Sequence, residues 1–328
     1  MHGHIQVVDM HSNHGASIDD VVALGSDQEP LAAWKERCRI QPETQIKLVK
    51  LSHMRYNIRT WMRLPRSCTV YLGMTVAKQT DNEVWCRGYG EDQYVDYARR
   101  GPKQFLGGTV QVKSYRDLER ARGLPEAGEI QELTAPGGGH LLTLCDPKGF
   151  PVNLIFGQEP AEAGAVPTKL TYNYEVDKPR TRKFQRFEPG PAAVHKRHPL
   201  HRARGTEKNV ALVAHIDLGE EYVDHHCFFL STNATTHVHH CSFKVHDFDT
   251  QKLGHQWLAA KGYKSVWGVG RHILGSQIFD YWWDTTGNMI EHYADGDLLN
   301  DKTPVGYRPA GDESLAVWRL EVPVSFLQ

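Results

Sequence analysis

The 328-residue sequence lacks three features that would each point to a particular class of protein. Its formal net charge is only −1, so neither the strong positive field of a nucleic-acid-binding protein nor an acidic tail is expected. No apolar run of roughly 18 residues occurs, and no basic-then-apolar leader opens the chain, so we expect no membrane span and no export. The cysteines include no CxxC pair, which predicts a reduced, cytoplasmic protein.

Histidine, by contrast, is abundant, with 19 residues in the chain. In a near-neutral protein this favours metal or proton chemistry. The first fourteen residues contain four histidines but no carboxylate or cysteine partner at ligand spacing. We therefore interpret residues 1–45 as a loosely ordered N-terminal segment and not as a metal-binding tract.

Three further regions follow from the patterning of the chain. Residues 46–158 are rich in predicted strands and form a first domain. Residues 159–193 contain five prolines and alternating charges, which is typical of a long surface connection. A second domain, with a C-terminal tail, is expected over residues 194–328.

Two sequence landmarks recur in the same order in both domains. "TVQVKSYRDLERA" (109–121) and "SFKVHDFDTQKLG" (242–254) each read as a strand, a polar turn and a helix. "DPKGFPVNLIF" (146–156) and "DTTGNMIEHYA" (284–294) each read as a turn and a closing strand. The repeat predicts an α+β fold of two domains, each made of paired βαβββ units that curl a mixed sheet around a cavity.

The repeat also locates the residues that could carry chemistry. His240 in the second domain corresponds to Gly107 in the first, and Glu291 corresponds to Asn153. Ligand-type side chains are thus present in one copy of a shared scaffold. This difference assigns the function to the second domain.

Alternation along the predicted strand 239–246 sorts its side chains into two faces. A histidine that only fills the core would be expected on the apolar face, so the polar position of His240 argues against a core role and leaves a functional or a merely solvated histidine. The polar face comprises His240, Ser242, Lys244 and His246, and the apolar face comprises Cys241, Phe243 and Val245.

Glu291 shares a predicted face with Met289 and Tyr293, where a carboxylate is costly unless it is paired or bound to a cation. Imidazole plus carboxylate is a ligand mix for divalent iron, manganese or zinc. Two histidines and one carboxylate form the open ferrous site that binds a substrate and O2 together. The pattern supplies His240 and Glu291, and leaves the second histidine to be found.

Three stretches resemble the type I extradiol ring-cleavage dioxygenases of the vicinal oxygen chelate superfamily. They are "HHCSFKVHDFDT" (239–250), "GVGRHILGSQIFDYWWD" (268–284) and "NMIEHYADGD" (288–297). The resemblance is dense over 206–300 and moderate in the first domain, where "RGYGEDQYV", "APGGG" and "LCDPKGF" fit the non-catalytic half. It implies four paired βαβββ units and a ferrous iron that helps insert both atoms of O2 beside the two hydroxyls of a catechol.

The resemblance assigns the catalytic residues one by one. His226 matches the histidine that handles the catechol proton, a task suited to an imidazole pKa, and His225 is the alternative. His272 matches a histidine that hydrogen-bonds bound oxygen or substrate, and Tyr281 matches the tyrosine that contacts the catecholate. Because the last two are nine residues apart, Gly275 is expected to bend the chain between them.

For the metal, the resemblance assigns His240 as one histidine ligand and Glu291 as the carboxylate ligand of Fe(II). The other histidine should lie in a run similar to "HKLGHFG". The chain offers His198, the nearest by counting, with His201 and His195 as alternatives.

Two stretches depart from the family pattern. The third unit, within 194–221, shows few residues where the first strand and helix should be, and Pro199 is expected to interrupt any strand there. This predicts a truncated third unit. Residues 57–70 are rich in arginine and proline where an amphipathic helix belongs. Both 57–70 and 195–205 suggest mistranslated or misspliced sequence, and a phosphate-binding basic patch is an alternative for 195–204.

The sequence therefore predicts an Fe(II)-dependent extradiol dioxygenase that cleaves a catechol-type ring with O2. The expected partners are a small aromatic diol and O2, with no nucleic acid or membrane, and the resemblance implies a homo-oligomer. Two rivals remain. One is a non-catalytic or inactive binding protein on the same scaffold, which the damaged third unit favours. The other is a glyoxalase-type metal isomerase, which Tyr281 and His272 disfavour.

Overall fold

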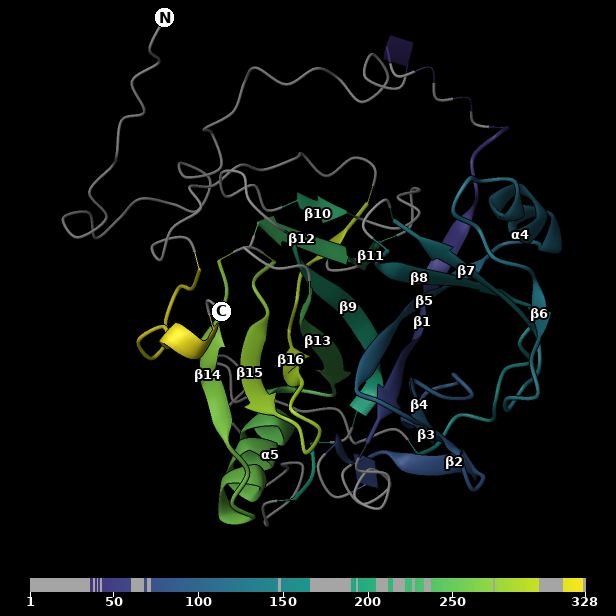
Figure 1. Cartoon of the computed structure of the whole chain (residues 1–328). Coiled ribbons are helices and arrows are strands. Elements are labelled where there is room, and N and C mark those ends of the chain that lie inside the picture. The colour runs from purple at the N-terminus through teal and green to yellow at the C-terminus, as the bar shows by residue number, and fades with distance from the viewer. Residues whose placement is uncertain are drawn as a thin grey trace, which may run out of the picture.

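Two β-sheet domains lie side by side in the computed structural model of the chain (Figure 1). Along 194–204, 212–214 and 229–232 the backbone alone is described. The residues that the structure describes are 36–37, 39, 41, 43–59, 68–69, 72–146, 149–165, 190–192, 194–204, 212–214, 222–225, 228–232, 237–273, 275–300 and 315–326.

The N-terminal domain is one eight-stranded sheet in the order β2-β3-β4-β1-β5-β8-β7-β6. The long strands β1 and β5 pair antiparallel at its centre and join two four-stranded halves. The strands are β1 (Leu48–Ile58), β2 (Thr75–Gln79), β3 (Glu83–Arg87), β4 (Asp96–Arg100), β5 (Gln104–Val112), β6 (Gln131–Glu132), β7 (His140–Cys145) and β8 (Pro151–Phe156).

Helix α4 (Tyr115–Arg122) follows β5 and covers one face of this sheet. Ser114 caps its N-terminus, because the serine hydroxyl accepts a hydrogen bond from the Asp117 backbone N–H. Leu118 and Ala121, one helical turn apart, are buried against the sheet. The run β5–α4–β6–β7–β8 is a complete βαβββ unit.

The C-terminal domain is a seven-stranded sheet in the order β10-β12-β9-β13-β16-β15-β14, with a short β11–β17 pair beside it. Asp247 caps helix α5 (Phe248–Ala260), which covers one face of the sheet. The other elements are β9 (Val194–Arg204), β10 (Leu212–Ala214), β11 (Val223–Asp224), β12 (Phe228–Thr232), β13 (His237–Val245), β14 (Ser265–Arg271), β15 (Ile278–Trp283), β16 (Met289–Ala294), β17 (Leu298–Leu299) and the 3-10 turn η3 (Val324–Phe326).

The two domains repeat the same strand register, as the sequence landmarks predict. In the first, β5 pairs with β8 in parallel and Thr109 lies opposite Asn153. In the second, β13 pairs with β16 in parallel and Ser242 lies opposite Glu291. The equivalence of Asn153 with Glu291 is therefore confirmed, and so is the predicted strand–helix–strand repeat.

The predicted loss of the third unit's first strand is wrong. Residues 194–204 form β9, an 11-residue strand that pairs antiparallel with β13. The ladder shifts register at Pro199, because Leu200 pairs with Cys241 whereas His198 pairs with Ser242. A proline has no backbone N–H to donate, and an extra residue at a bulge needs no ladder bond, so the strand tolerates it. The helix expected to be missing falls on residues outside those described.

The domains share a hydrophobic core. Met54 and Cys86 from the first domain pack in one cluster with Phe243 and Trp282 from the second. At this interface the Tyr56 hydroxyl lies 2.7 Å from Cys241 Sγ.

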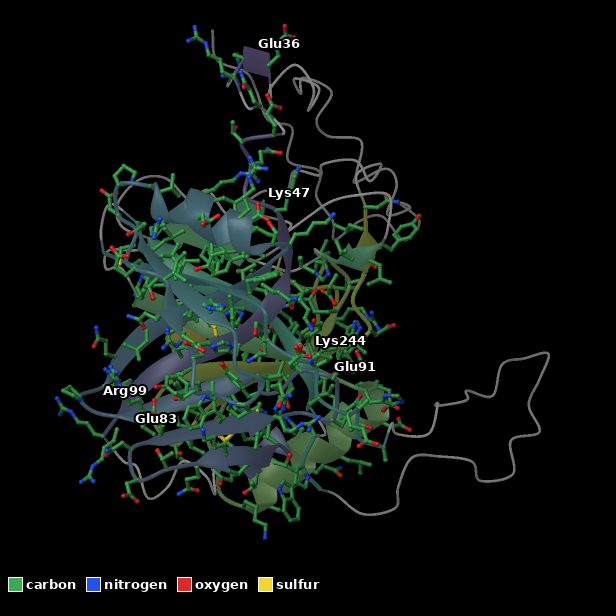
Figure 2. All side chains as sticks on the ribbon, turned by 90° about the vertical axis from the view of Figure 1, so that its right-hand side faces the viewer. Glu36, Lys47, Glu83, Glu91, Arg99 and Lys244 are labelled. Atoms are coloured by element: carbon green, nitrogen blue, oxygen red, sulfur yellow. The ribbon has the colours of Figure 1, made fainter. Side chains whose placement is uncertain are left out.

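The outer surface carries charges of both signs, among them Glu83 and Arg99 on the N-terminal sheet (Figure 2). No helix within the described residues is long and apolar enough to cross a membrane. None of the cysteines with described side chains forms a disulfide; these are Cys68, Cys86, Cys145 and Cys241.

Candidate metal centre

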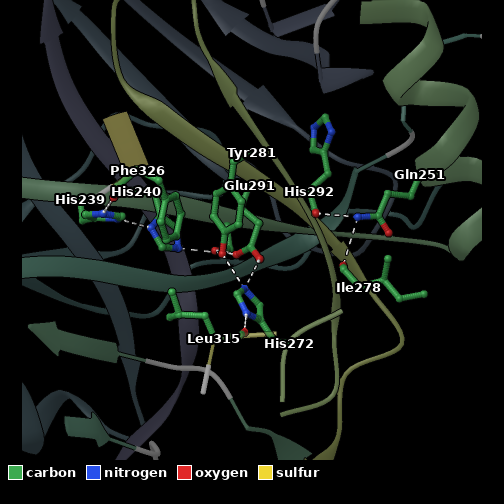
Figure 3. Close-up of polar contacts among 11 residues, drawn as sticks. His239, His240, Gln251, His272, Ile278, Tyr281, Glu291, His292, Leu315 and Phe326 are labelled. Carbon is green, nitrogen blue, oxygen red and sulfur yellow. Dashed lines mark hydrogen bonds and ion pairs between the residues drawn. The ribbon is translucent and has the colours of Figure 1, made fainter. Parts of the chain in front are cut away.

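Three adjacent strands bring the predicted ligand and substrate-contact residues together on one face of the C-terminal sheet. Tyr281 of β15 pairs with Glu291 of β16, and Glu291 pairs with Ser242 of β13, two residues after His240. His240 and Glu291 are 3% and 1% exposed, and His240 Nε2 lies 3.7 Å from Glu291 Oε2 (Figure 3). The strand order thus assembles side chains that are far apart in the sequence.

Glu291 is a buried carboxylate whose surroundings suit a bound cation. Burial raises its pKa to about 8, and the hydrogen bond from the Ser242 hydroxyl offsets only part of that shift. Its Oε1 lies 3.9 Å from His272 Nε2, beyond hydrogen-bond reach. A divalent metal would supply the positive partner that this carboxylate lacks among the described residues, so the residues present fit the metal that the resemblance implies.

His272 contacts Tyr281. The Leu315 carbonyl lies 2.6 Å from His272 Nδ1 and can only accept, so Nδ1 carries a hydrogen. Burial lowers the pKa of His272 to about 4, and the neutral ring accepts at Nε2 from the Tyr281 hydroxyl at 2.9 Å. The bend expected at Gly275 is present, because this glycine has φ +77° in the turn between β14 and β15.

Aromatic rings enclose Tyr281. The Trp267 ring stacks parallel to it at 5.9 Å, and the His240 and Phe326 rings meet it edge-on at 4.9 and 4.8 Å. Burial raises the pKa of Tyr281 well above its usual range, with the charge of Glu291 adding to the shift. The hydroxyl therefore stays protonated near neutral pH.

His225, the alternative proton-handling histidine, lies at the same turn as His272. Its imidazole packs directly against Gly275, where a Cβ atom would overlap the ring. His225 Nδ1 is 3.3 Å from the Asp297 carbonyl, and any positive charge on it would oppose protonation of His272. His226, the first assignment from the resemblance, lies outside the described residues.

Two residues of this region escaped the sequence-based reasoning. Asp224 is buried beside the site, where Lys244 and the Tyr293 hydroxyl both lie 3.1 Å from its Oδ2. Lys244 on the predicted polar face could have suggested a carboxylate partner. No sequence signal pointed to Phe326, which returns from the C-terminal tail.

The remaining histidine ligand cannot be assigned from described side chains, among which no group of three metal-type ligands comes together. The backbone register of β9 narrows the choice. His201 pairs directly with His240, and His198 pairs with Ser242. His195 lies further along β9, near the pairing of Lys196 with Lys244.

The equivalent position in the N-terminal domain holds an arginine. Arg55 pairs with Gly107 as His201 pairs with His240, and its guanidinium donates to Asn153 Oδ1 at 3.2 Å. Asn153 is fully buried and also accepts from Thr143. A fixed positive group thus stands where the second domain has its candidate metal ligands.

Comparison with known proteins supports this reading of the fold. No family model matches the chain. Metapyrocatechase 2 of Cupriavidus necator is 36% identical over 110 residues, which are 32% of this chain and 33% of the relative. The match therefore spans about a third of that protein's length.

Solved structures match over most of the chain. The Mn(II)-bound glyoxalase from Novosphingobium aromaticivorans has a TM-score of 0.67 and 15% identity over 86% of this chain and 94% of its own. Homoprotocatechuate 2,3-dioxygenase from Arthrobacter globiformis has a TM-score of 0.62 and 17% identity, over 78% of this chain and 82% of its own. The complex of the Brevibacterium fuscum enzyme with 3,4-dihydroxyphenylacetate has a TM-score of 0.67 and 14% identity, over 86% of this chain and 92% of its own.

These identities show the fold alone, which is the α+β vicinal oxygen chelate fold that the sequence predicts. Together with the metapyrocatechase match, they confirm the resemblance to the extradiol dioxygenases of this superfamily.

Proposed function

We propose that this chain is an Fe(II)-dependent extradiol dioxygenase that opens a catechol-type ring with O2. One observation carries the proposal: His240, Glu291, Tyr281 and His272 converge on one buried face of the C-terminal sheet. The similarity to a protein named metapyrocatechase supports it.

The metal would be held by His240 through Nε2 and by Glu291 through its carboxylate. When bound, ferrous iron supplies the redox and Lewis-acid chemistry that lets such sites use a chelating substrate and O2 together. Burial of both side chains excludes water and strengthens every electrostatic contact at the site.

We propose His201 as the remaining histidine ligand. Residues that pair directly across an antiparallel ladder share one face of the sheet, and His201 is the residue of β9 opposite His240. His198 is the alternative. It is nearest to the family's ligand position by counting along the sequence, and it pairs with Ser242, two residues after His240.

The chain's own side chains would orient the substrate and move its proton. The Tyr281 hydroxyl donates to His272, so its oxygen can accept from a catechol hydroxyl. His225 lies at the same turn and is the described residue that we assign to proton transfer, because an imidazole can both accept and release a proton. Trp267 and Phe326 provide aromatic walls for a ring.

The glyoxalase-type isomerase is the second candidate, because a Mn(II)-bound glyoxalase shares the fold. The contact between His272 and Tyr281 favours the dioxygenase, since it presents a neutral phenol–imidazole pair to a diol. Turnover separates both enzymes from a non-catalytic binding protein. The homo-oligomer stays a prediction, which light scattering would test.

The test is to purify the chain anaerobically with ferrous iron and to measure iron per chain, O2 uptake and cleavage of catechol and 2,3-dihydroxybiphenyl. The hemithioacetal of glutathione and methylglyoxal serves as the isomerase substrate. We expect ring cleavage with one O2 consumed per ring. Isomerase turnover without ring cleavage, or iron retention with neither activity, would contradict the proposal.

The ligand assignment is tested with the matched variants His201→Ala and His198→Ala. We expect His201→Ala to lose iron and His198→Ala to retain it. The reverse result would reassign the ligand to His198, and retention of iron by both variants would exclude both residues.

A further inference from the structure

His239, the residue before the proposed ligand His240, forms a hydrogen-bonded chain with it. His239 Nδ1 lies 2.7 Å from His240 Nδ1, and His239 Nε2 lies 2.6 Å from the Phe326 carbonyl oxygen (Figure 3). The two imidazole rings are nearly perpendicular, with centroids 5.0 Å apart. Adjacent residues of a strand normally face opposite sides of the sheet, but the ladder shifts register at His239, since Val238 pairs with Arg202 and His240 with His201, so the two rings can meet.

The direction of these two hydrogen bonds follows from the Phe326 carbonyl, which is the last group in the series. A carbonyl oxygen can only accept, so His239 Nε2 must carry the hydrogen that it shares with Phe326. In neutral His239 the other nitrogen, Nδ1, is then an acceptor. The hydrogen between the two rings must therefore come from His240 Nδ1.

This direction fixes the form of His240. With its hydrogen on Nδ1, the neutral ring has no hydrogen on Nε2, which is the nitrogen turned towards Glu291. A metal binds an imidazole nitrogen only in this deprotonated form. Metal-binding histidines usually hold this form by donating their other N–H to a carbonyl or carboxylate, and here a second histidine stands in between.

We propose that His239 is a positioning residue that holds His240 in its metal-binding tautomer, with the backbone carbonyl of Phe326 as the anchor. The inference rests on the proposed function insofar as His240 is a metal ligand. It adds a residue, and a role for the C-terminal segment, that the ring-cleavage proposal does not require.

The anchor is itself held in place by the sheet. The Phe326 ring packs against His239, Trp267 and Tyr281 with centroids 5.1, 4.6 and 4.8 Å away. Trp267 Nε1 donates to the Leu320 carbonyl at 3.1 Å, and His272 donates to the Leu315 carbonyl. The ring N–H groups of His239, Trp267 and His272 thus donate to three carbonyls within residues 315–326. These hydrogen bonds set the position of the Phe326 carbonyl.

The first test reads the tautomer directly in the metal-free protein. Long-range nitrogen–proton NMR distinguishes the protonated ring nitrogen of each histidine. We expect His240 to carry its hydrogen on Nδ1 and His239 on Nε2. A His240 ring with its hydrogen on Nε2 would overturn the proposal, whether or not the chain has ring-cleavage activity.

The second test compares two substitutions of His239 by their affinity for Co²⁺ and Fe²⁺. His239→Leu removes both polar atoms, whereas His239→Gln keeps one acceptor for His240 and one donor for Phe326. Loss of such a supporting partner typically weakens metal binding by about 10- to 100-fold. We expect His239→Leu to fall in that range and His239→Gln to recover most of the loss. Equal affinities of His239→Leu and wild type would overturn the proposal.

The anchor is tested by separating the Phe326 carbonyl from its side chain. Phe326→Ala keeps the backbone carbonyl, and truncation after Pro323 removes it. We expect the truncated chain to show mixed His240 tautomers and weaker metal binding, and Phe326→Ala to keep the Nδ1–H form. His140→Gln, in the N-terminal domain, controls for a generic effect of losing a histidine. An unchanged tautomer in the truncated chain would contradict the role of the carbonyl.

Discussion

His240 Nε2 and Glu291 Oε2 face one another at 3.7 Å in the interior of the C-terminal sheet, too far apart for a hydrogen bond. A direct hydrogen bond would have explained the burial of Glu291 by an ion pair with His240. The spacing instead leaves the imidazole nitrogen and the carboxylate oxygen close enough for one cation to contact both.

The first prediction concerns Glu291. We expect Glu291→Gln to abolish iron retention while the metal-free protein stays folded, because the amide has the same size and avoids the cost of burying a charge. Iron per chain and the thermal midpoint of the metal-free variant are the measurements. The exposed Glu129→Gln is the matched control and should bind iron normally. Full iron stoichiometry in Glu291→Gln would remove Glu291 from the ligand set.

The N-terminal domain should resist conversion into a second metal site. We expect Gly107→His combined with Asn153→Glu to bind no second equivalent of iron. A Cβ at Gly107 would lie 2.9 Å from the Pro151 carbonyl oxygen, the glycine has φ +108°, and Arg55 would pair with the new carboxylate. Metal analysis of the double variant tests this, with Asn153→Glu alone as its control. Two tightly bound irons per chain would show that Arg55 does not block the position.

Phe326 should limit the size of the substrate ring. It is 7% exposed and packs against Tyr281 and Trp267, so Phe326→Ala would open space beside the proposed substrate site. Hydrophobic pockets discriminate by about 10-fold or more per small group. We expect the ratio of kcat/KM for 3-substituted catechols over catechol to rise by on the order of 10-fold. An unchanged ratio would place the ring-binding space elsewhere.

His292 should make the protein sensitive to acid. It is fully buried, neither ring nitrogen has a hydrogen-bond partner among the described residues, and burial lowers its pKa from 6.5 to about 4. Between these two values the unfolded chain binds a proton that the folded one does not, so stability falls as the pH falls from 6.5 to 4. The difference of about 2.5 units corresponds to about 3 kcal/mol.

We expect His292→Leu to reduce this loss, with His272 still contributing in the same pH range. Urea unfolding of the metal-free protein at pH 7 and pH 4.5 measures it, and His140→Leu is the control. An equal loss in His292→Leu and wild type would show that His292 is not the source.

The sequence by itself determined the repeating unit and singled out two candidate ligands. Alternating strands, a capped helix and a Gly-containing turn recur in 109–156 and 242–294, and these signals are local, so they survive without knowledge of the fold. Because the unit is repeated, the difference between His240 and Gly107, and between Glu291 and Asn153, could be read position by position. The register of β13 with β16 shows that this equivalence is correct.

Only the tertiary structure decided what stands next to those ligands. Pro199 argues locally against a strand, yet β9 forms because its long-range ladder with β13 places the proline at a bulge. The contact of His239 with the Phe326 carbonyl and that of Arg55 with Asn153 both join residues far apart in the chain. Strand order and register create such contacts, and no periodicity within a single strand or helix encodes them.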